Sequence, residues 1–268
     1  MKPAAAPDIL LEITERRRQR LGGEAALRLP GPAPRQDAEA NELCAALTER
    51  RGAAVIAEVK MGSPKLGSLV GSFDPEEQAR VYARNGAAAL SVVVEPDFFF
   101  GSYELLERCR RASGLPAIAK DFDVTPKQLE LARRAGASAV LLIAALHDAD
   151  CLWGYAEAAR DLGLVPLVET HSLADVAKLG DRNWELVGVN NRDLRDFSVD
   201  LQRSIDLVPR LPPTALKVAE SGIRDVEDLH RLRDGGFDAF LVGETLVKAR
   251  DPGLELRRLL ETAAGGEA

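Results

Sequence analysis

The sequence predicts an α/β fold, a (β/α)8 TIM barrel with a helical extension at its N-terminus. Short apolar runs alternate eight times with amphipathic segments after residue 52, and this order predicts a parallel sheet covered by helices. Glycines stand between several helical segments and the next apolar run, where they can end a helix. An open doubly wound sheet is the less favoured alternative, because no G-x-G-x-x-G fingerprint follows the first run.

The chain is expected to have two parts. Apolar positions among charges predict a helix over 8–21, and a second helix is expected over 42–52. Prolines and glycines predict a linker over 29–37 between them. We expect residues 1–52 to form a helical extension that packs on the barrel or covers one of its ends, and residues 53–268 to form the catalytic barrel.

Eight apolar runs are the expected barrel strands, because runs rich in Val, Ile, Leu and Ala are typical of buried strands. They span 53–59, 88–95, 117–120, 138–143, 164–169, 185–190, 215–220 and 238–243. Helices are expected at 75–86, 102–112, 126–135, 147–162, 172–180, about 200–209, 224–234 and near 252–263. Right-handed crossovers between parallel strands would then close the barrel.

Composition and charge exclude several classes of protein. Hydrophobic residues make up 46% of the 268 residues, which is enough for a sizeable core. The net charge of −7 argues against nucleic acid or an anionic membrane as the main partner. No apolar run is long enough to span a bilayer, and the N-terminus does not have the pattern of a secretory signal. Three separated cysteines without a C-x-x-C pattern suggest reduced thiols, so the cytoplasm is the expected location.

Charged residues end several of the predicted strands, and in this fold the site lies at the carboxyl ends of the strands. Glu58 and Lys60 are two residues apart and therefore share one face of the first strand. Lys120 and Phe122 repeat this spacing, and a ring beside a lysine suits an aromatic substrate. Further polar residues at strand ends are Glu169, Asn190, Glu220 and Ser221. These residues predict acid–base chemistry, and ion pairs that merely close the barrel are the alternative.

Other polar residues are assigned structural roles. Glu95 precedes Pro96 and is expected to support its loop. His171 is expected to start a helix rather than to join Glu169, and His147 and His230 are expected on the solvent side of helices. Because the three histidines lack ligand spacing, we expect no metal site.

Two glycine-containing strand ends predict a phosphate site. Ser221 and Gly222 follow the seventh strand, and Gly243 and Glu244 follow the eighth. Loops at these places are the usual phosphate cradle of the fold, with backbone N–H groups as donors. The Glu244 side chain should then point away from the phosphate. The loop over 61–72 has three glycines but no Lys-Ser/Thr pair, so it is expected to be a mobile lid rather than a P-loop.

The residue types alone thus predict a barrel enzyme that acts on a phosphorylated small molecule without a metal or nucleotide cofactor. They do not name the substrate. Seven ordered motifs go further, because together they resemble indole-3-glycerol phosphate synthase, a lyase of tryptophan biosynthesis. These motifs are AEVKMGSP, FFGSYELL, AIAKDFDV, LVPLVETH, GVNNRDL, VAESGI and FLVGETL. The resemblance covers nearly the whole chain, including the N-terminal extension.

The resemblance implies a reaction. The substrate would be 1-(2-carboxyphenylamino)-1-deoxyribulose 5-phosphate, and the products indole-3-glycerol phosphate, carbon dioxide and water. The enzyme would be a carbon–carbon carboxy-lyase without a cofactor, and the family's common form is a monomer. Two loop sites depart from the family pattern. Met61 and Gly62 stand where a basic and a small residue are common, and Phe100 stands where a polar residue is usual.

The resemblance also implies roles for single residues. Lys120 would be the general acid and Glu169 the general base, with Glu58, Lys60 and Asn190 in the same catalytic set. The residues implied in binding the rest of the substrate are Arg192, Glu220, Ser221, Phe99 and Phe122. Those implied around the phosphate are Ser63, Gly222, Gly243 and Glu244.

Two other functions remain open at this point. A phosphosugar isomerase acting on an aminated ribose or ribulose phosphate could share the phosphate cradle, because fold alone does not fix function. Such isomerases usually work with an Asp or Cys pair, which disagrees with the lysines and glutamates here. A non-catalytic phosphometabolite-binding protein would require loss of key residues, yet Glu58, Lys60, Lys120 and Glu169 are all in place.

Overall fold

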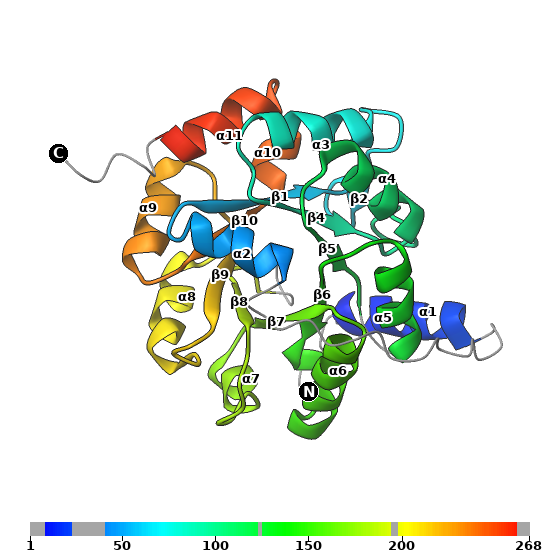
Figure 1. The fold of residues 1–268 in the computed structure, drawn as a ribbon, viewed down its shortest axis with the longest axis vertical. Coiled ribbons are helices and arrows are strands. Elements are labelled where there is room, and N and C mark those ends of the chain that lie inside the picture. The colour runs from blue at the N-terminus through cyan, green and yellow to red at the C-terminus, as the bar shows by residue number, and fades with distance from the viewer. Residues whose placement is uncertain (1–8, 23–40, 123–124, 194–197, 262–268) are drawn as a thin grey trace, which may run out of the picture.

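Eight parallel strands close into a barrel with helices on its outside (Figure 1). The structure is a computed structural model, and it describes residues 9–22, 41–122, 125–193 and 198–261. Around the barrel the strand order is β1-β10-β9-β8-β7-β6-β5-β4, and β4 pairs with β1 to complete the ring. The strands are β1 Ala54–Val59, β4 Ala89–Val93, β5 Ala117–Lys120, β6 Ala139–Ile143, β7 Val165–Thr170, β8 Leu186–Asn190, β9 Leu216–Glu220 and β10 Ala239–Val242. The predicted TIM barrel is confirmed.

The helices follow the predicted alternation with two differences. They are α3 Pro75–Arg84, α4 Tyr103–Ser113, α5 Pro126–Arg134, α6 Ala149–Asp161, α7 Leu173–Ala177, α8 Leu201–Leu207, α9 Val226–Asp234, α10 Glu244–Lys248 and α11 Pro252–Glu261, with 3-10 turns η2 Ala144–Leu146 and η3 Val208–Arg210. The short α10 was not predicted, and α7 is shorter than the expected 172–180. Both are five-residue helices, which are too short to show a helical period in the sequence.

Local sequence explains where the longer helices begin. Asp74 caps α3 by accepting hydrogen bonds from the backbone N–H groups of Glu76 and Glu77, and Pro75 occupies the first helical position. Ser102 caps α4 in the same way, accepting from the backbone of Leu105. These caps satisfy donors that would otherwise lack partners at a helix start.

Alternation along the strands sorts the core into two shells. On β1, Val55 and Ala57 point outward and join the cluster between sheet and helices, whereas Ala54 and Ile56 belong to the cluster inside the barrel. Glu58 continues the inward series one step beyond Ile56. The strand therefore carries this carboxylate to the top of the barrel interior, on the face that the i, i+2 rule predicts.

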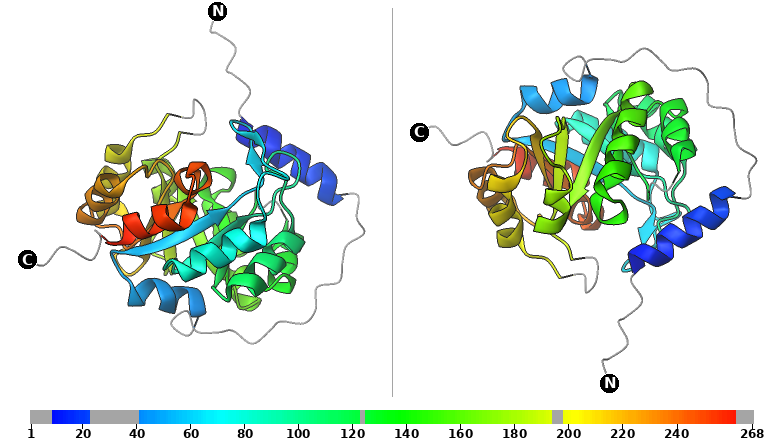
Figure 2. Two further views of the ribbon diagram at one scale, coloured as in Figure 1. Left: turned by 90° about the horizontal axis from the view of Figure 1, so that it is seen from above. Right: turned by 90° about the horizontal axis from the view of Figure 1, so that it is seen from below.

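The N-terminal extension contributes one helix to each end of the barrel (Figure 2). Helix α2, Glu42–Glu49, packs Leu43 and Leu47 into the interior cluster at one end. Helix α1, Ile9–Gly22, lies over the opposite end, where its Leu10 joins the same cluster. The extension thus covers both ends, although only one was expected. The linker expected over 29–37 lies outside the described residues, and the division at residue 52 stays a prediction.

The structure also bears on membrane-spanning helices and on the state of the cysteines. No helix within the described ranges is long and apolar enough to cross a membrane. The three cysteines are free thiols: Cys44 and Cys109 are buried, and Cys151 is exposed.

Candidate active site

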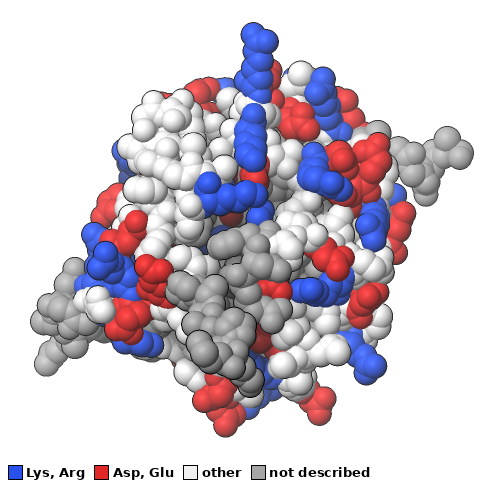
Figure 3. Space-filling view, turned by 180° about the vertical axis from the view of Figure 1, so that it is seen from behind, with Lys and Arg blue, Asp and Glu red and all other residues white. Residues whose placement is uncertain are grey.

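A cavity of about 720 Å³ opens at the carboxyl ends of the barrel strands. Residues from the ends of β1, β5, β7, β8 and β10 line it, and residues of α1 close one side. Seen from the side opposite α2, Lys and Arg side chains gather around the centre of this face (Figure 3). Of the fourteen residues named as site candidates from the sequence, all but Glu220 line this cavity. Glu220 lies just beneath it and is fully buried.

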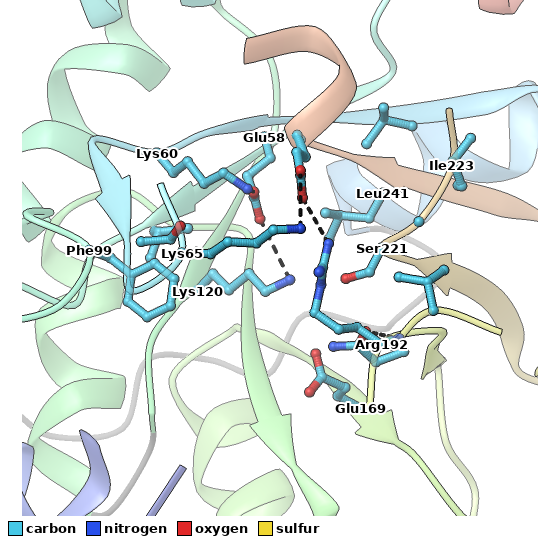
Figure 4. Close-up of a pocket in the computed structure, with 18 of the residues that line it drawn as sticks. Glu58, Lys60, Lys65, Phe99, Lys120, Glu169, Arg192, Ser221, Ile223 and Leu241 are labelled. Atoms are coloured by element: carbon cyan, nitrogen blue, oxygen red, sulfur yellow. Dashed lines mark hydrogen bonds and ion pairs between the residues drawn. The ribbon is translucent and has the colours of Figure 1, made fainter. Parts of the chain in front are cut away.

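Two lysines and two glutamates form a largely buried cluster at the cavity floor. Figure 4 shows three of them, Glu58, Lys60 and Lys120. Lys120 Nζ lies 3.0 Å from Glu220 Oε2 and 3.6 Å from Glu58 Oε2. Lys60 Nζ lies 2.7 Å from Glu58 Oε1. Burying a single charge is unfavourable, so each of these groups depends on its partners.

Two glycines, Gly188 in the middle of β8 and Gly243 just after β10, make room for these carboxylates. A Cβ at Gly243 would collide with the Glu58 carboxylate, and one at Gly188 would collide with that of Glu220. Gly243 was expected to allow close approach of a phosphate, and this stays a prediction. In the structure, the Glu58 carboxylate occupies the space that a side chain at Gly243 would fill.

A third glutamate, Glu169, brings a surplus of negative charge to the site. Glu169 is 2% exposed, and its neighbours include Glu220 and Asn190. Three carboxylates thus face two ammonium groups in a region from which water is largely excluded. Burial raises the pKa of Glu169, although the charge of Lys120 and hydrogen bonds from Glu220 and Asn190 act against it. Burial, opposed by Lys120 and reinforced by Glu169, raises the pKa of Glu220 to about 7. The pair therefore retains a proton near neutral pH, as adjacent carboxylates do.

Lys120 and Glu58 stay ionised. Burial opposes the charge on Lys120, but Glu220 and Glu58 outweigh it, so the pKa of Lys120 is raised. Burial likewise opposes the charge on Glu58, but Lys60 and Lys120 outweigh it and lower the pKa of Glu58. At neutral pH the site thus contains a charged lysine able to donate a proton and a carboxylate pair able to accept one.

An apolar wall lines another side of the cavity. The rings of Phe99 and Phe122 lie 5.9 Å apart between centroids, and Ile9, Leu10 and Ile13 of α1 complete the lining. The buried carboxylate of Glu95 accepts backbone hydrogen bonds from Asp97, Phe98 and Phe99 at 2.7–3.0 Å. This confirms that Glu95 supports its loop, and the contact fixes the backbone that presents Phe99.

Helix α1 is anchored to the cavity rim by a buried ion pair. Arg17 of α1 binds the carboxylate of Asp121, which immediately follows Lys120, and both side chains are almost fully buried. The hydroxyl of Tyr103 also donates to Asp121 at 2.8 Å. The extension therefore completes the cavity wall next to the central lysine.

The remaining side of the cavity is cationic. Arg192 follows β8, and its backbone N–H donates to Asn190 Oδ1 at 3.0 Å. Lys65 reaches in from the loop over 61–72, which contains the two-stranded hairpin β2 Gly62–Ser63 and β3 Gly67–Ser68. Its mobility as a lid stays a prediction. Ser221 and Gly222 line the same side with positive φ angles of 66° and 76°. For Ser221, which is not a glycine, this conformation is strained, and strained backbone often marks a functional site.

Two side chains make contacts that were not expected. The Glu244 side chain lies on the cationic side of the empty cavity and forms ion pairs there with Arg192 at 2.8 Å and Lys248 at 2.6 Å, and its orientation away from a bound phosphate stays a prediction. His171 does precede a helix, α7, yet its Nε2 lies 3.3 Å from Glu169 Oε1. Burial lowers the pKa of His171, so its ring is neutral beside that carboxylate at neutral pH.

The other two histidines are partly exposed. His147 precedes α6 instead of lying in it, with its ring 4.9 Å from that of Tyr155, and His230 lies on α9.

Lys65 and the α1 residues at the cavity were missed as site residues. A possible signal for Lys65 was its i, i+2 spacing from Ser63, whereas nothing in the sequence of α1 indicates which end of the barrel it covers. Among the described residues, no group of three or more His, Cys, Asp or Glu side chains could hold a metal ion.

Comparisons with known proteins show to which family the chain belongs. The family model described as indole-3-glycerol phosphate synthase matches residues 12–259. The chain belongs to the indole-3-glycerol phosphate synthase family. A relative of that name from Variovorax paradoxus is 42% identical over 266 residues, covering 95% of this chain and all of the relative. Another of that name, from Koribacter versatilis, is 44% identical over 218 residues, covering 80% of this chain and 84% of the relative.

Solved structures add support for the fold alone. The 3-hexulose-6-phosphate synthase from Salmonella typhimurium superposes with a TM-score of 0.62 at 15% identity, covering 80% of this chain and 100% of that one. Thiamine phosphate pyrophosphorylase from Pyrococcus furiosus superposes with a TM-score of 0.59 at 16% identity, covering 81% and 100%. Membership of the indole-3-glycerol phosphate synthase family decides against the phosphosugar isomerase, and it makes the chain a lyase of tryptophan biosynthesis.

Replacing Gly243 by alanine tests whether Glu58 needs the space at the end of β10. The added Cβ would displace the Glu58 carboxylate and with it Lys60 and Lys120. We expect kcat/KM of Gly243→Ala to fall by about 10- to 100-fold, as misplaced catalytic groups do. Gly154→Ala is the matched control, because nothing lies within 4 Å of a Cβ on this α6 residue. Equal activity of the two variants would contradict the crowding argument.

The raised pKa of Glu220 predicts a pH dependence of stability. Between pH 4.5, the ordinary value for a Glu, and pH 7 the unfolded chain loses a proton that the folded protein keeps. The free energy of unfolding therefore falls by on the order of 1–3 kcal/mol as the pH rises through this window. Glu220→Gln removes the titrating group, so its free energy of unfolding should depend less on pH. Urea denaturation of both proteins from pH 4.5 to 7.5 measures this, and parallel curves would refute the assignment.

Proposed function

We propose that this chain converts 1-(2-carboxyphenylamino)-1-deoxyribulose 5-phosphate to indole-3-glycerol phosphate, carbon dioxide and water. The observation that carries the proposal is the buried cluster of Lys120, Lys60 and three glutamates, set between an aromatic wall and a cationic side of one cavity. A substrate with an aromatic acid at one end and a phosphate at the other matches that polarity.

Binding would place each end of the substrate against its complement. The substrate ring would pack on Phe99 and Phe122, which supply apolar area. Its phosphate would lie near Arg192 and Lys65, together with backbone N–H groups after β9 and β10. Ser63 lines the same region; its hydroxyl accepts a hydrogen bond from the backbone of Leu66. The ketone of the ribulose chain would then lie between the ring and the phosphate, over the lysines.

Ring closure needs an acid at the ketone oxygen. The aromatic carbon that carries the carboxylate attacks the ketone carbon, and the ketone oxygen takes a proton. Lys120 is the proposed donor, because it is charged and central in the cluster. Carbon dioxide then leaves, and its bonding electrons restore the aromatic ring. Lys60, held by Glu58, adds positive charge against the substrate carboxylate.

Dehydration needs an acid and a base together. The new hydroxyl leaves as water after receiving a proton, and a base removes a ring proton to form the indole double bond. Glu169 is the proposed base, because its raised pKa makes it a stronger base than an ordinary glutamate. Glu169 and Glu220 share one proton, so the pair still carries a negative charge at neutral pH. Asn190 and Glu220 would hold it in place. These steps need neither a metal nor a cofactor, because the side chains supply both acid and base.

We further propose that the enzyme works as a monomer in the cytoplasm, without nucleic acid or a membrane as partner. The negative net charge supports the absence of nucleic acid. Large apolar side chains that are exposed among the described residues lie scattered on different elements, which supports a monomer. They are Leu11, Val70, Phe100, Leu173, Val199 and Leu254.

Turnover of the substrate by Lys120→Met tests the proposed function. Methionine keeps the bulk of the side chain but cannot donate a proton, so kcat should fall by roughly 10²- to 10⁴-fold. Indole fluorescence measures product in the presence of a chelator, and circular dichroism confirms the fold. Lys217→Met, on the outer face of β9, is the control and should keep wild-type kcat. A wild-type protein that binds the substrate without turning it over would contradict the proposal.

A further inference from the structure

A carboxylate stands among the cations of the cavity. Glu244 Oε2 accepts a hydrogen bond from Arg192 Nη2 at 2.8 Å, and Glu244 Oε1 accepts one from Lys248 Nζ at 2.6 Å. Lys65 Nζ lies 3.7 Å from the same Oε1. Figure 4 shows Lys65 and Arg192 reaching toward one point from opposite sides of the cavity. Glu244 thus links three segments that are distant in sequence: the hairpin after β1, the loop after β8 and helix α10.

The charge on Glu244 is permanent at physiological pH. The hydrogen bond from Lys248, together with Arg192 and Lys65, lowers the pKa of Glu244 to about 2 in spite of partial burial. Its side chain is 27% exposed, so the carboxylate has solvent on one side into which it can turn. The Glu244 side chain is therefore charged, and it has room to move toward solvent.

The same cations are the proposed partners of the substrate phosphate. Arginine and lysine bind phosphate and carboxylate oxygens with the same donors, so the two anions compete for them. Given the proposed function, we propose that the Glu244 carboxylate is an internal competitor of the phosphate. It neutralises Arg192 and Lys65 in the free enzyme and turns aside when the phosphate binds.

This arrangement has consequences for binding and release. The cations stay paired and oriented while the cavity is empty, which limits their mutual repulsion. Displacing Glu244 weakens the affinity for every phosphorylated ligand, and the product keeps the phosphate of the substrate. Glu244 therefore favours release of the product at the expense of tight binding.

An orienting role for Glu244 makes the opposite prediction. If the carboxylate served only to aim Arg192 at the phosphate, its removal would weaken phosphate binding. If it competes, its removal strengthens phosphate binding. The sign of the change distinguishes the two roles, whatever its size.

Titration calorimetry with inorganic phosphate at constant ionic strength tests the proposal on the full-length wild-type protein and Glu244→Gln. We expect the variant to bind phosphate about three- to tenfold more tightly, in the range of partly exposed ion pairs. The ratio should shrink when sodium chloride is raised, because salt screens exposed charges. The KM for the substrate should fall in the same direction. Glu244→Ala lacks both the carboxylate and the amide of the glutamine variant, and it should shift the phosphate affinity in the same direction.

Glu77→Gln is the matched control. Glu77 pairs with Arg80 and Arg84 on α3, outside the residues that line the cavity, so it shares the change in charge but not the location. Its phosphate affinity should equal that of the wild type. Equal or weaker binding by Glu244→Gln, in a protein whose wild type turns over the substrate, would overturn the inference alone. A wild type that neither binds phosphate nor turns over the substrate would overturn the proposed function as well.

Discussion

The site depends on Lys120, which is held between the carboxylates of Glu58 and Glu220 at the top of the barrel interior. Each charge in this set would be unfavourable alone, and removing one partner from a buried pair leaves the other uncompensated. The surrounding backbone is adapted to the cluster, because Gly188 and Gly243 leave the space that the two carboxylates fill. Burial raises the pKa values of Glu169 and Glu220, so a proton shared by these carboxylates lies beside the charged lysine.

The cavity walls give this cluster a direction. Phe99 and Phe122 make one side apolar, and Arg192 and Lys65 make another cationic, so the walls favour one orientation of a ligand that has an apolar end and an anionic end. Helix α1 belongs to this arrangement, because Arg17 ties it to Asp121, the neighbour of Lys120. Helix α1 is therefore part of the cavity wall.

The sequence predicted the residues on strands better than the contacts between loops. Glu58, Lys120 and Glu169 could be placed together because parallel strands bring their carboxyl ends to one edge of the barrel. The orientation of Glu244 and the contact of His171 with Glu169 could not. Each depends on partners or on a local turn that has no periodic pattern. The family resemblance supplied the substrate, which residue types alone did not name.

A crystal structure with indole-3-glycerol phosphate bound would test the central claim most directly. We expect the indole ring to lie against Phe99 and Phe122, the phosphate between Arg192 and Lys65, and the reacting carbons beside Lys120 and Glu169. The Glu244 carboxylate should then be turned away from Arg192. A product bound in the opposite sense, or with its ring remote from the buried lysines, would contradict the assignment of the cluster to the chemistry.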